Sequence, residues 1–223
     1  MRTLVFDTET TGLAKTQIIS PSTIHLWPHV VQFSYIVFDT ESNKIVKIKD
    51  SIIKVPDGFT ITEENAKIHG ITTEISLTKG VDLLPVLEEF FTDFDSVDHI
   101  VGHNVSFDIN MIKAELQRLI MNSSDKKLQE YLTTINTSTK FYCTMQETIE
   151  LCAIELKDKY GRPYKKFPKL VELYQKMFGV TPKNLHNSLN DVIVCLRCFI
   201  KLKYEIDIVE RSEEVKQMIK DYL

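Results

Sequence analysis

Three short segments of the sequence place acidic residues where a structural element begins or ends. Asp7 and Glu9 lie two positions apart in LVFDTETTGL. On a strand their side chains therefore share one face. Two carboxylates this close repel each other unless a cation separates them, and their oxygens suit a hard divalent ion such as Mg²⁺ or Mn²⁺. Taken alone, this segment has an alternative interpretation, in which the acids are capping or turn residues at the end of a strand and Gly12 provides the turn.

Two further segments carry acids in comparable settings. Asp108, in HNVSFDINMI, is expected in the first turn of a helix, where the helix dipole alone also favours an acid. In LHNSLNDVIVC, His186 precedes a helix that carries Asp191, and a solvated helix start is the alternative. Together the four carboxylates suggest two metal ions that clamp an in-line displacement at phosphorus. His186 is suited to take a proton from the attacking water.

The elements that must position these residues alternate between strands and helices. Strands are predicted at 2–7, 30–39, 44–55, 99–104 and 141–143, the first three forming an antiparallel meander. Helices are predicted within 61–72 (N-cap Thr62, with Gly70 after its end), at 81–94, 106–120, within 122–139, through 154, and near 168–178, 187–203 and 206–222. This order predicts an α/β fold with a mixed five-stranded sheet, an antiparallel meander plus parallel strands, flanked by helices.

Composition narrows the class of protein. The 223 residues, 43% of them apolar, predict a single domain over 1–223. Without a leader or a long apolar run, we expect no membrane contact and an intracellular, cytoplasmic location, or a nuclear or viral replication site. The net charge of -4 argues against a large binding surface for duplex DNA.

Cys195 and Cys198 are expected on a buried helix face, because a zinc site would need a second ligand pair.

The segments DTETTG, HN-x-x-FD and LHNSLND resemble the three motifs of the DEDDh, DnaQ-like 3′–5′ exonucleases. This family includes the proofreading subunit of bacterial DNA polymerase III, ribonuclease T and the mammalian three-prime repair exonucleases. The resemblance covers roughly residues 2–203, leaving a C-terminal helix at 204–223, and IHGIT at 68–72 also resembles a family segment. It implies a ribonuclease-H-like fold.

The resemblance also implies a role for each residue that matches a motif. Asp7 would bridge two divalent ions, Glu9 and Asp191 would hold the ion that carries the attacking water, Asp108 would support the second ion, and His186 would be the general base. The residues implied at the substrate are Thr10 and Leu13, with Ile68, His69, Asn104 and Phe107 as further candidates for which packing or capping is the alternative. His103 is expected to be structural.

The expected substrate is a free 3′ end of DNA, single-stranded or frayed, shortened with release of nucleoside 5′-monophosphates. The basic, aromatic segment KDKYGRPYKKFPK at 157–169 is predicted to be a loop beside this substrate, with Lys165 and Lys166 as contacts. A solvated loop is the alternative. Trp27, in the connection 14–29, is expected to cover the sheet edge rather than the substrate entrance.

Three other functions remain to be weighed against this one. The first is a 3′–5′ exoribonuclease of the ribonuclease T or oligoribonuclease type, and the second is a catalytically silent nucleic-acid-binding module. A haloacid-dehalogenase-like phosphatase would need Asp-x-Asp, whereas this chain has Asp-x-Glu. A stand-alone enzyme and a subunit that docks on a polymerase through its globular surface are both open. The amphipathic C-terminal helix could form a homodimer, but it is expected to pack on its own domain.

Overall fold

The computed structural model describes residues 1–222 and is built around one five-stranded mixed sheet. The strands are β1 (Arg2–Thr10), β2 (Val30–Asp39), β3 (Lys44–Ile52), β4 (His99–Gly102) and β5 (Phe141–Cys143), in the order β3-β2-β1-β4-β5. β1, β2 and β3 pair antiparallel, whereas β4 pairs parallel with β1 and with β5. The predicted fold class is confirmed, and β1 runs three residues further than predicted.

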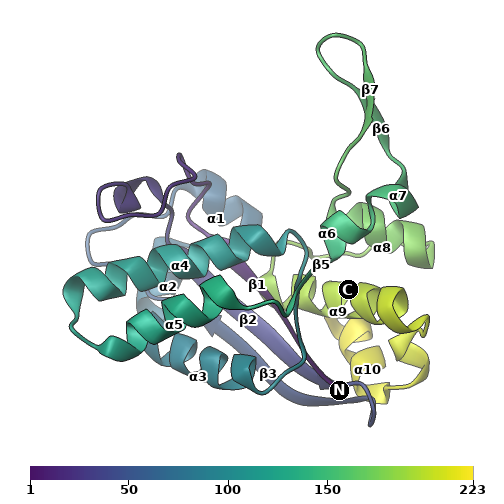
Figure 1. Ribbon diagram of the computed structural model, residues 1–223, viewed down its shortest axis with the longest axis horizontal. Coiled ribbons are helices and arrows are strands. Elements are labelled where there is room, and N and C mark those ends of the chain that lie inside the picture. Colours follow the sequence, from purple (N-terminus) through teal and green to yellow (C-terminus); the bar gives the residue numbers. More distant parts are fainter. Residues whose placement is uncertain (223) are drawn as a thin grey trace.

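Helices cover both faces of this sheet (Figure 1). α3 (Leu83–Asp95), α4 (Val105–Asn122) and α5 (Lys126–Thr137) gather on one side, and α9 (Ser188–Tyr204) and α10 (Glu213–Tyr222) on the other. Successive residues of β1 alternate between the two layers: Leu4 and Phe6 join the core under α3 and α4, whereas Val5 joins the core under α9. Because Asp7 and Glu9 continue the phase of Val5, they face the α9 side.

Two short helices follow the meander. α1 (Glu63–His69) begins as predicted at Thr62, whose side chain accepts a hydrogen bond from the Asn65 backbone N–H, and ends at Gly70 in the left-handed region. α2 (Thr73–Lys79) was not predicted, because its seven residues after the Thr72 cap are too few to show a helical pattern. In the connection before β2, a turn of 3-10 helix, η1 (Ile24–Leu26), precedes Trp27, which is 6% exposed and packs into the core as expected.

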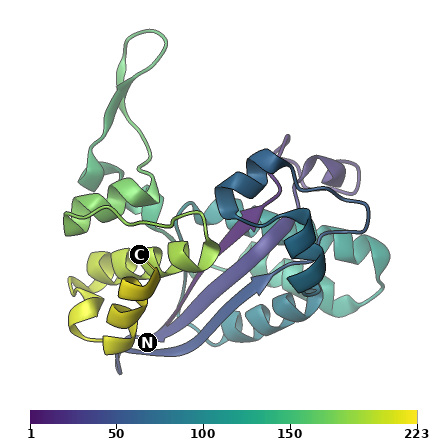
Figure 2. The ribbon, with the colours of Figure 1, turned by 180° about the vertical axis from the view of Figure 1, so that it is seen from behind.

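The C-terminal half departs from the prediction at several points. The single helix expected after β5 is two, α6 (Thr144–Glu147) and α7 (Ile149–Cys152), divided at the buried Thr148. The segment predicted as a loop at 157–169 instead contains most of an antiparallel hairpin, β6 (Glu155–Lys157) and β7 (Pro163–Lys165), which projects from the body (Figures 1 and 2). α8 (Leu170–Phe178) follows it.

The end of the chain closes the α9 layer. The helix expected over 206–222 is a 3-10 turn, η2 (Ile208–Glu210), followed by the shorter α10. Val215 of α10 is buried in the α9 core, so this amphipathic helix packs on its own chain as expected. Cys195 and Cys198 are buried and free, which confirms their predicted place on a buried helix face. Among the described residues, none of the helices combines the length and apolar character needed to cross a bilayer.

Candidate active site

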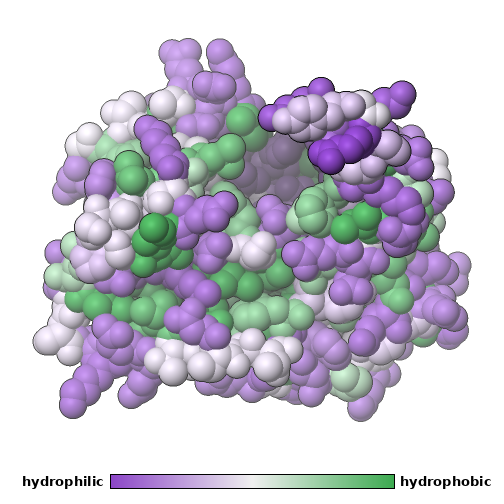
Figure 3. Space-filling view, turned by 45° about the horizontal axis from the view of Figure 1, so that its top comes forward, coloured by the Kyte–Doolittle hydropathy of each residue, from purple (hydrophilic) through white to green (hydrophobic). Residues whose placement is uncertain are grey.

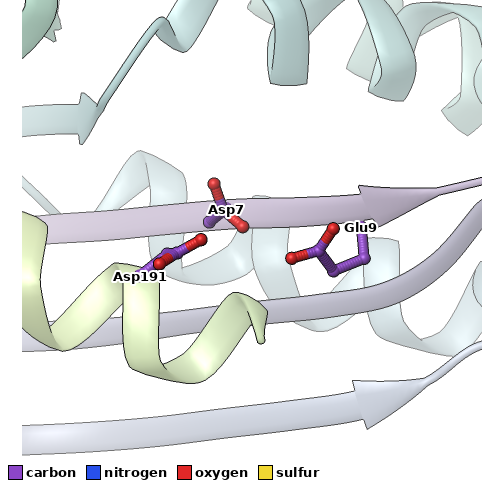
Figure 4. Close-up of side chains that lie close together, drawn as sticks. All are labelled: Asp7, Glu9 and Asp191. Atoms are coloured by element: carbon purple, nitrogen blue, oxygen red, sulfur yellow. The ribbon is translucent and has the colours of Figure 1, made fainter. Parts of the chain in front are cut away.

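The acid cluster lies at the carboxyl end of β1. Asp7 and Glu9 project from this strand toward α9, and Asp191 projects back from the first turn of α9 (Figure 4). One carboxylate oxygen from each residue lies within 4.8 Å of the others. A register shift against β2 between Glu9 and Thr10 marks the point where the strand leaves regular pairing. Such irregularities often re-aim a side chain next to an active site.

Asp108 reaches the same strand from the opposite layer. It is 3% exposed, and its Oδ1 accepts hydrogen bonds from the backbone N–H of Thr8 at 3.0 Å and from the Thr8 hydroxyl at 2.7 Å. A tight turn between β4 and α4 makes this approach possible. A Cβ on Gly102 would stand 3.1 Å from the Val105 side chain, and Asn104 begins the helix in the left-handed region. All four predicted acids are therefore fixed on or against β1.

Hydrogen bonds that pass through the buried Gln32 and Ser188 hold α9 against the sheet. The Ser188 hydroxyl donates to the backbone carbonyl of Asp7 at 2.7 Å. The Ser188 N–H donates to the side-chain carbonyl of Gln32 at 3.1 Å, and the Gln32 amide donates to Asp50 at 2.7 Å. This chain of bonds joins β1, β2, β3 and the first turn of α9, which carries Asp191. Sequence reasoning missed Gln32 and Ser188, because their contact spans 156 residues and leaves no local pattern.

His186 lies at the exposed rim of the cluster. Its backbone is in the left-handed region, with φ 69°, and its N–H donates to Asp191 Oδ2 at 3.3 Å. The following residue, Asn187, caps α9 by accepting a hydrogen bond from the Asn190 N–H. The loop that carries the predicted general base is thus bonded directly to one of the predicted metal ligands.

The electrostatics of the cluster favour protonation when no cation is present. Burial raises the pKa of Asp7 well above its usual range, and the neighbouring carboxylates raise it further. Burial together with Asp191 and Asp108 raises the pKa of Glu9 to about 8. Burial also raises the pKa of Asp108 and of Asp191 to about 7, although hydrogen bonds from Thr8 and from the His186 backbone oppose these shifts. A divalent cation would relieve this repulsion.

The cluster also contains an unsatisfied acceptor. Asp191 Oδ1 is buried and finds no hydrogen-bond partner within residues 1–222. A buried carboxylate oxygen without a donor is costly unless another group, such as a cation, satisfies it. The donor set of carboxylate oxygens at the end of a rigid strand therefore fits a hard divalent ion.

The residues predicted to meet the terminal nucleotide border the cluster. The Thr10 hydroxyl donates to the Gly12 carbonyl at 2.7 Å, so it stabilises the turn after β1. Leu13 is 80% exposed, and together with the half-buried Phe107 it lines a cavity of about 500 Å³. Asn104 starts α4, one turn before Asp108.

α1 forms the other border of this region. The side-chain amide of Asn65 donates to the Thr11 carbonyl at 2.6 Å, which ties α1 to the turn after β1. His69 is buried, and burial lowers its pKa while an interaction with the backbone of Thr10 opposes that shift. Ile68 is 51% exposed on the same helix. The structure thus gathers these residues near the end of β1, and their contacts with a substrate stay a prediction.

Arg118, a partly buried residue of α4, fixes the connection between β1 and β2. Arg118 lies 2.9 Å from Glu115, and it also donates to the backbone carbonyls of Trp27 and Pro28. This connection and the end of α4 enclose a second cavity of about 600 Å³, which Leu13 also lines. The connection is therefore anchored to α4 by buried hydrogen bonds rather than held by Trp27 packing alone.

The two lysines predicted to contact substrate lie near the base of the hairpin and are already paired. Lys165 forms an ion pair with Glu150, and Lys166 lies 2.8 Å from a carboxylate oxygen of Glu172. His103 is structural as expected, because its two ring nitrogens lie 3.0 Å from the Thr144 hydroxyl and from the Pro168 carbonyl. Burial lowers the pKa of His103 to about 4, so it is neutral near pH 7.

Comparison with known proteins places this site in a family. Residues 4–199 match the model of the RNase T exonuclease family, which is most of the chain. The chain therefore belongs to this exonuclease family. The match confirms the DEDDh, DnaQ-like resemblance that the three motifs indicate, and with it the exonuclease class.

Individual relatives are distant and longer. The epsilon subunit of DNA polymerase III from Buchnera aphidicola is 25% identical over 154 residues, covering 67% of this chain and 53% of that protein. The PolC-type DNA polymerase III of Listeria welshimeri is 23% identical and covers 71% of this chain but 12% of that protein. The chain thus spans at most about half the length of these relatives.

Solved structures show the same fold. E. coli exonuclease I in complex with a dT13 oligonucleotide superposes with a TM-score of 0.61 at 19% identity, covering 92% of this chain and 42% of that one. Another exonuclease I structure gives a TM-score of 0.62 at 17% identity, covering 94% and 42%. The shared part is the ribonuclease-H-like sheet and its helices.

Proposed function

We propose that the protein is a metal-dependent 3′–5′ exonuclease that shortens single-stranded or frayed DNA and releases nucleoside 5′-monophosphates. The observation that carries this proposal is the convergence of four acids from β1, α4 and α9 at one strand end, with the Asp191 Oδ1 atom buried and unsatisfied. The preference for DNA draws on relatives named as parts of DNA polymerase III and on a neighbour solved with dT13. The proposal of a polymerase partner rests on the name of the first relative, the epsilon subunit of DNA polymerase III. A homodimer is a separate prediction.

Asp7, Glu9, Asp108 and Asp191 are the residues that would hold two divalent ions. Mg²⁺ or Mn²⁺ bound there would supply an activated water and stabilise the leaving oxygen of an in-line displacement. Asp7 shares the cluster with Glu9 and Asp191, and Asp108 is placed to support the second position through its contact with Thr8.

The protein itself would orient the strand end and move one proton. His186, at the exposed rim, accepts the proton of the attacking water, and its loop is held to Asp191 by the backbone hydrogen bond. Leu13 and Ile68 offer exposed apolar side chains against which a terminal base can pack. Thr10 fixes the turn that presents Leu13.

A time course on matched DNA and RNA single strands, labelled at the 5′ end, tests the proposal. With Mg²⁺ we expect a ladder that shortens from the 3′ end, with DNA cut faster than RNA. EDTA should abolish it, and Asp7→Asn should slow it by at least roughly a thousandfold. Asp95→Asn is the matched control, because this exposed acid on α3 undergoes the same change in charge and shape.

Each other result assigns a different function. Faster shortening of RNA would make the protein an exoribonuclease. Immediate release of the labelled mononucleotide would indicate the opposite polarity. No shortening by a folded protein with either Mg²⁺ or Mn²⁺ would refute the proposal and favour the binding module.

A further inference from the structure

We propose that the β6–β7 hairpin binds the single strand upstream of its 3′ end, stacking a base on Tyr160 and pairing phosphates with Lys157 and Lys159. This inference rests on the proposed function, because it concerns the strand whose end enters the acid cluster. It assigns the contact to the tip and outer edge of the hairpin, whereas the sequence pointed to Lys165 and Lys166.

The base of the hairpin is attached beside the acid site. Thr144, at the start of α6, donates to the carbonyl of Gly102 and contacts His103, both at the end of β4. On the return side, the Pro168 carbonyl contacts the other ring nitrogen of His103. His103 immediately precedes Asn104, where the helix of Asp108 begins. Both sides of the hairpin are therefore attached near the carboxyl ends of the strands, where the acids gather.

The surface is hollowed next to the hairpin. Figure 3, a view that brings the hairpin forward, shows a recess beside a projecting hydrophilic segment. Figures 1 and 2 show that this segment extends well beyond the helices around it. From Glu155 to Asp158, whose N–H still bonds to the Arg162 carbonyl, the hairpin rises roughly 10 Å at about 3.4 Å per residue. A stacked strand spaced at about 3.4 Å per nucleotide would pass some three nucleotides along it.

The tip of the hairpin is locally ordered. Asp158 accepts hydrogen bonds from the backbone N–H groups of Tyr160 at 2.8 Å and Arg162 at 2.9 Å, and from the Arg162 guanidinium at 2.8 Å. Gly161 supplies the left-handed residue, with φ 80°, that closes the turn. These bonds fix the backbone that carries Tyr160, so this backbone loses little further conformational entropy on binding.

The chemistry of the tip fits a strand of stacked bases and phosphates. Tyr160 is 70% exposed, with Lys159 Nζ 5.0 Å and the Arg162 guanidinium 5.3 Å from its ring centroid. Tyr164 is 48% exposed on the same hairpin. Residues 155–165 contain four basic and two acidic residues in a chain of net charge -4. Exposed aromatics interleaved with cations bind single strands without reading base edges.

The basic residues of the hairpin fall into two groups, those held in ion pairs and those that form none with the described residues. Lys165 pairs with Glu150 of α7, and Arg162 pairs with Asp158 within the turn. Lys157 and Lys159 are exposed and form no ion pair with the described residues. Their ammonium groups are therefore available to phosphates without first breaking an ion pair.

Steady-state kinetics on single strands of about 4 and about 20 nucleotides test the inference, because only the longer strand reaches the tip. Tyr160→Ala should raise KM for the long strand at least roughly fivefold and leave the short strand unchanged, whereas Tyr160→Phe keeps the stacking surface. The double variant Lys157→Ala/Lys159→Ala should lower the slope of log KM against log salt by about 1.4. Lys44→Ala/Lys220→Ala, on β3 and α10, is its matched control.

Binding measured apart from hydrolysis distinguishes the two proposals. In an Asp7→Asn background with Mg²⁺, fluorescence anisotropy of the long strand should show the same fivefold loss on Tyr160→Ala. If the wild type degrades strands but Tyr160→Ala matches it in both KM and affinity, the hairpin inference is overturned and the proposed function stands. If nothing is degraded but Tyr160→Ala still weakens binding, the proposed function fails and the hairpin inference stands.

Discussion

The acid cluster and the hairpin are held together in opposite ways. The cluster draws Asp7, Asp108 and Asp191 from distant parts of the chain and fixes them by bonds between buried groups that span 100 to 181 residues. The hairpin is held by contacts within a few residues of one another, such as those of Asp158, and is exposed along its length. Reaction at a phosphate requires side chains from distant parts of the chain to be held at precise positions. Binding of a single strand requires only a locally rigid surface.

This difference predicts that variants in the two regions change different kinetic constants. A shift in the cluster would misplace groups that we propose to act in the transition state, so kcat should fall. A change at the hairpin alters binding that ground state and transition state share, so KM rises. The predictions below test that separation, in decreasing order of expected effect.

The largest effect is expected from Gln32, which stands opposite Glu9 in the β1–β2 register and bonds to the first turn of α9. Gln32→Leu removes the acceptor of the Ser188 N–H, so the first turn of α9 and its Asp191 lose a fixed position. We expect kcat to fall roughly tenfold or more, the Mg²⁺ concentration for half-maximal activity to rise, and KM to stay nearly unchanged. Steady-state kinetics over a Mg²⁺ titration measure all three.

Ser34→Ala is the matched control for this variant. It removes the other side-chain hydrogen bond to Asp50, at 2.8 Å, and keeps the hydrogen bond between Gln32 and the Ser188 N–H. If Gln32→Leu and Ser34→Ala lower kcat equally while thermal unfolding midpoints stay equal, Gln32 does not position Asp191. A rise in KM for long strands alone would break the separation between the two regions.

An intermediate effect is expected on the stability of the metal-free protein. The folded pKa values of Glu9, about 8, and of Asp108 and Asp191, about 7, exceed the usual values of about 4 in an unfolded chain. The folded state therefore binds protons more tightly. Its extra stability is present below pH 4 and is lost as the pH rises toward 8.

Thermal unfolding in EDTA measures this loss. Between pH 5 and pH 8 we expect the midpoint to fall by at least about 3 °C more for the wild type than for Asp191→Asn. Mg²⁺ should restore the midpoint at pH 8 in the wild type alone. A midpoint that is equally pH-dependent in both proteins would mean that the acids are not electrostatically strained.

The two regions also differ in how far the sequence could predict them. The four acids and His186 could be named as candidates because each stands in a motif beside a strand or helix, and the sheet followed from the strand pattern. The contact of Ser188 with Gln32 could not, because it depends on how distant elements pack. The sequence predicts a loop in place of the hairpin, because the three-residue strands are too short to show alternation. The turn residues Asp158 to Gly161 are a signal that could have indicated the hairpin.

The smallest effect is expected from the two lysines near the hairpin base. Lys165 and Lys166 already face Glu150 and Glu172, so their charge is largely compensated before any strand arrives. Neutralising both to Ala should raise KM by only about twofold at low salt, and by less as salt screens the phosphates.

Glu150→Gln provides the opposite change at the same place. It releases the Lys165 ammonium from an exposed partner, so KM for a long strand should fall slightly at low salt. KM values that do not vary with salt in either variant would remove these lysines from the binding surface. If neutralising Lys165 and Lys166 raised KM more than Tyr160→Ala does, the main contact with the strand would lie at the base of the hairpin and not at its tip.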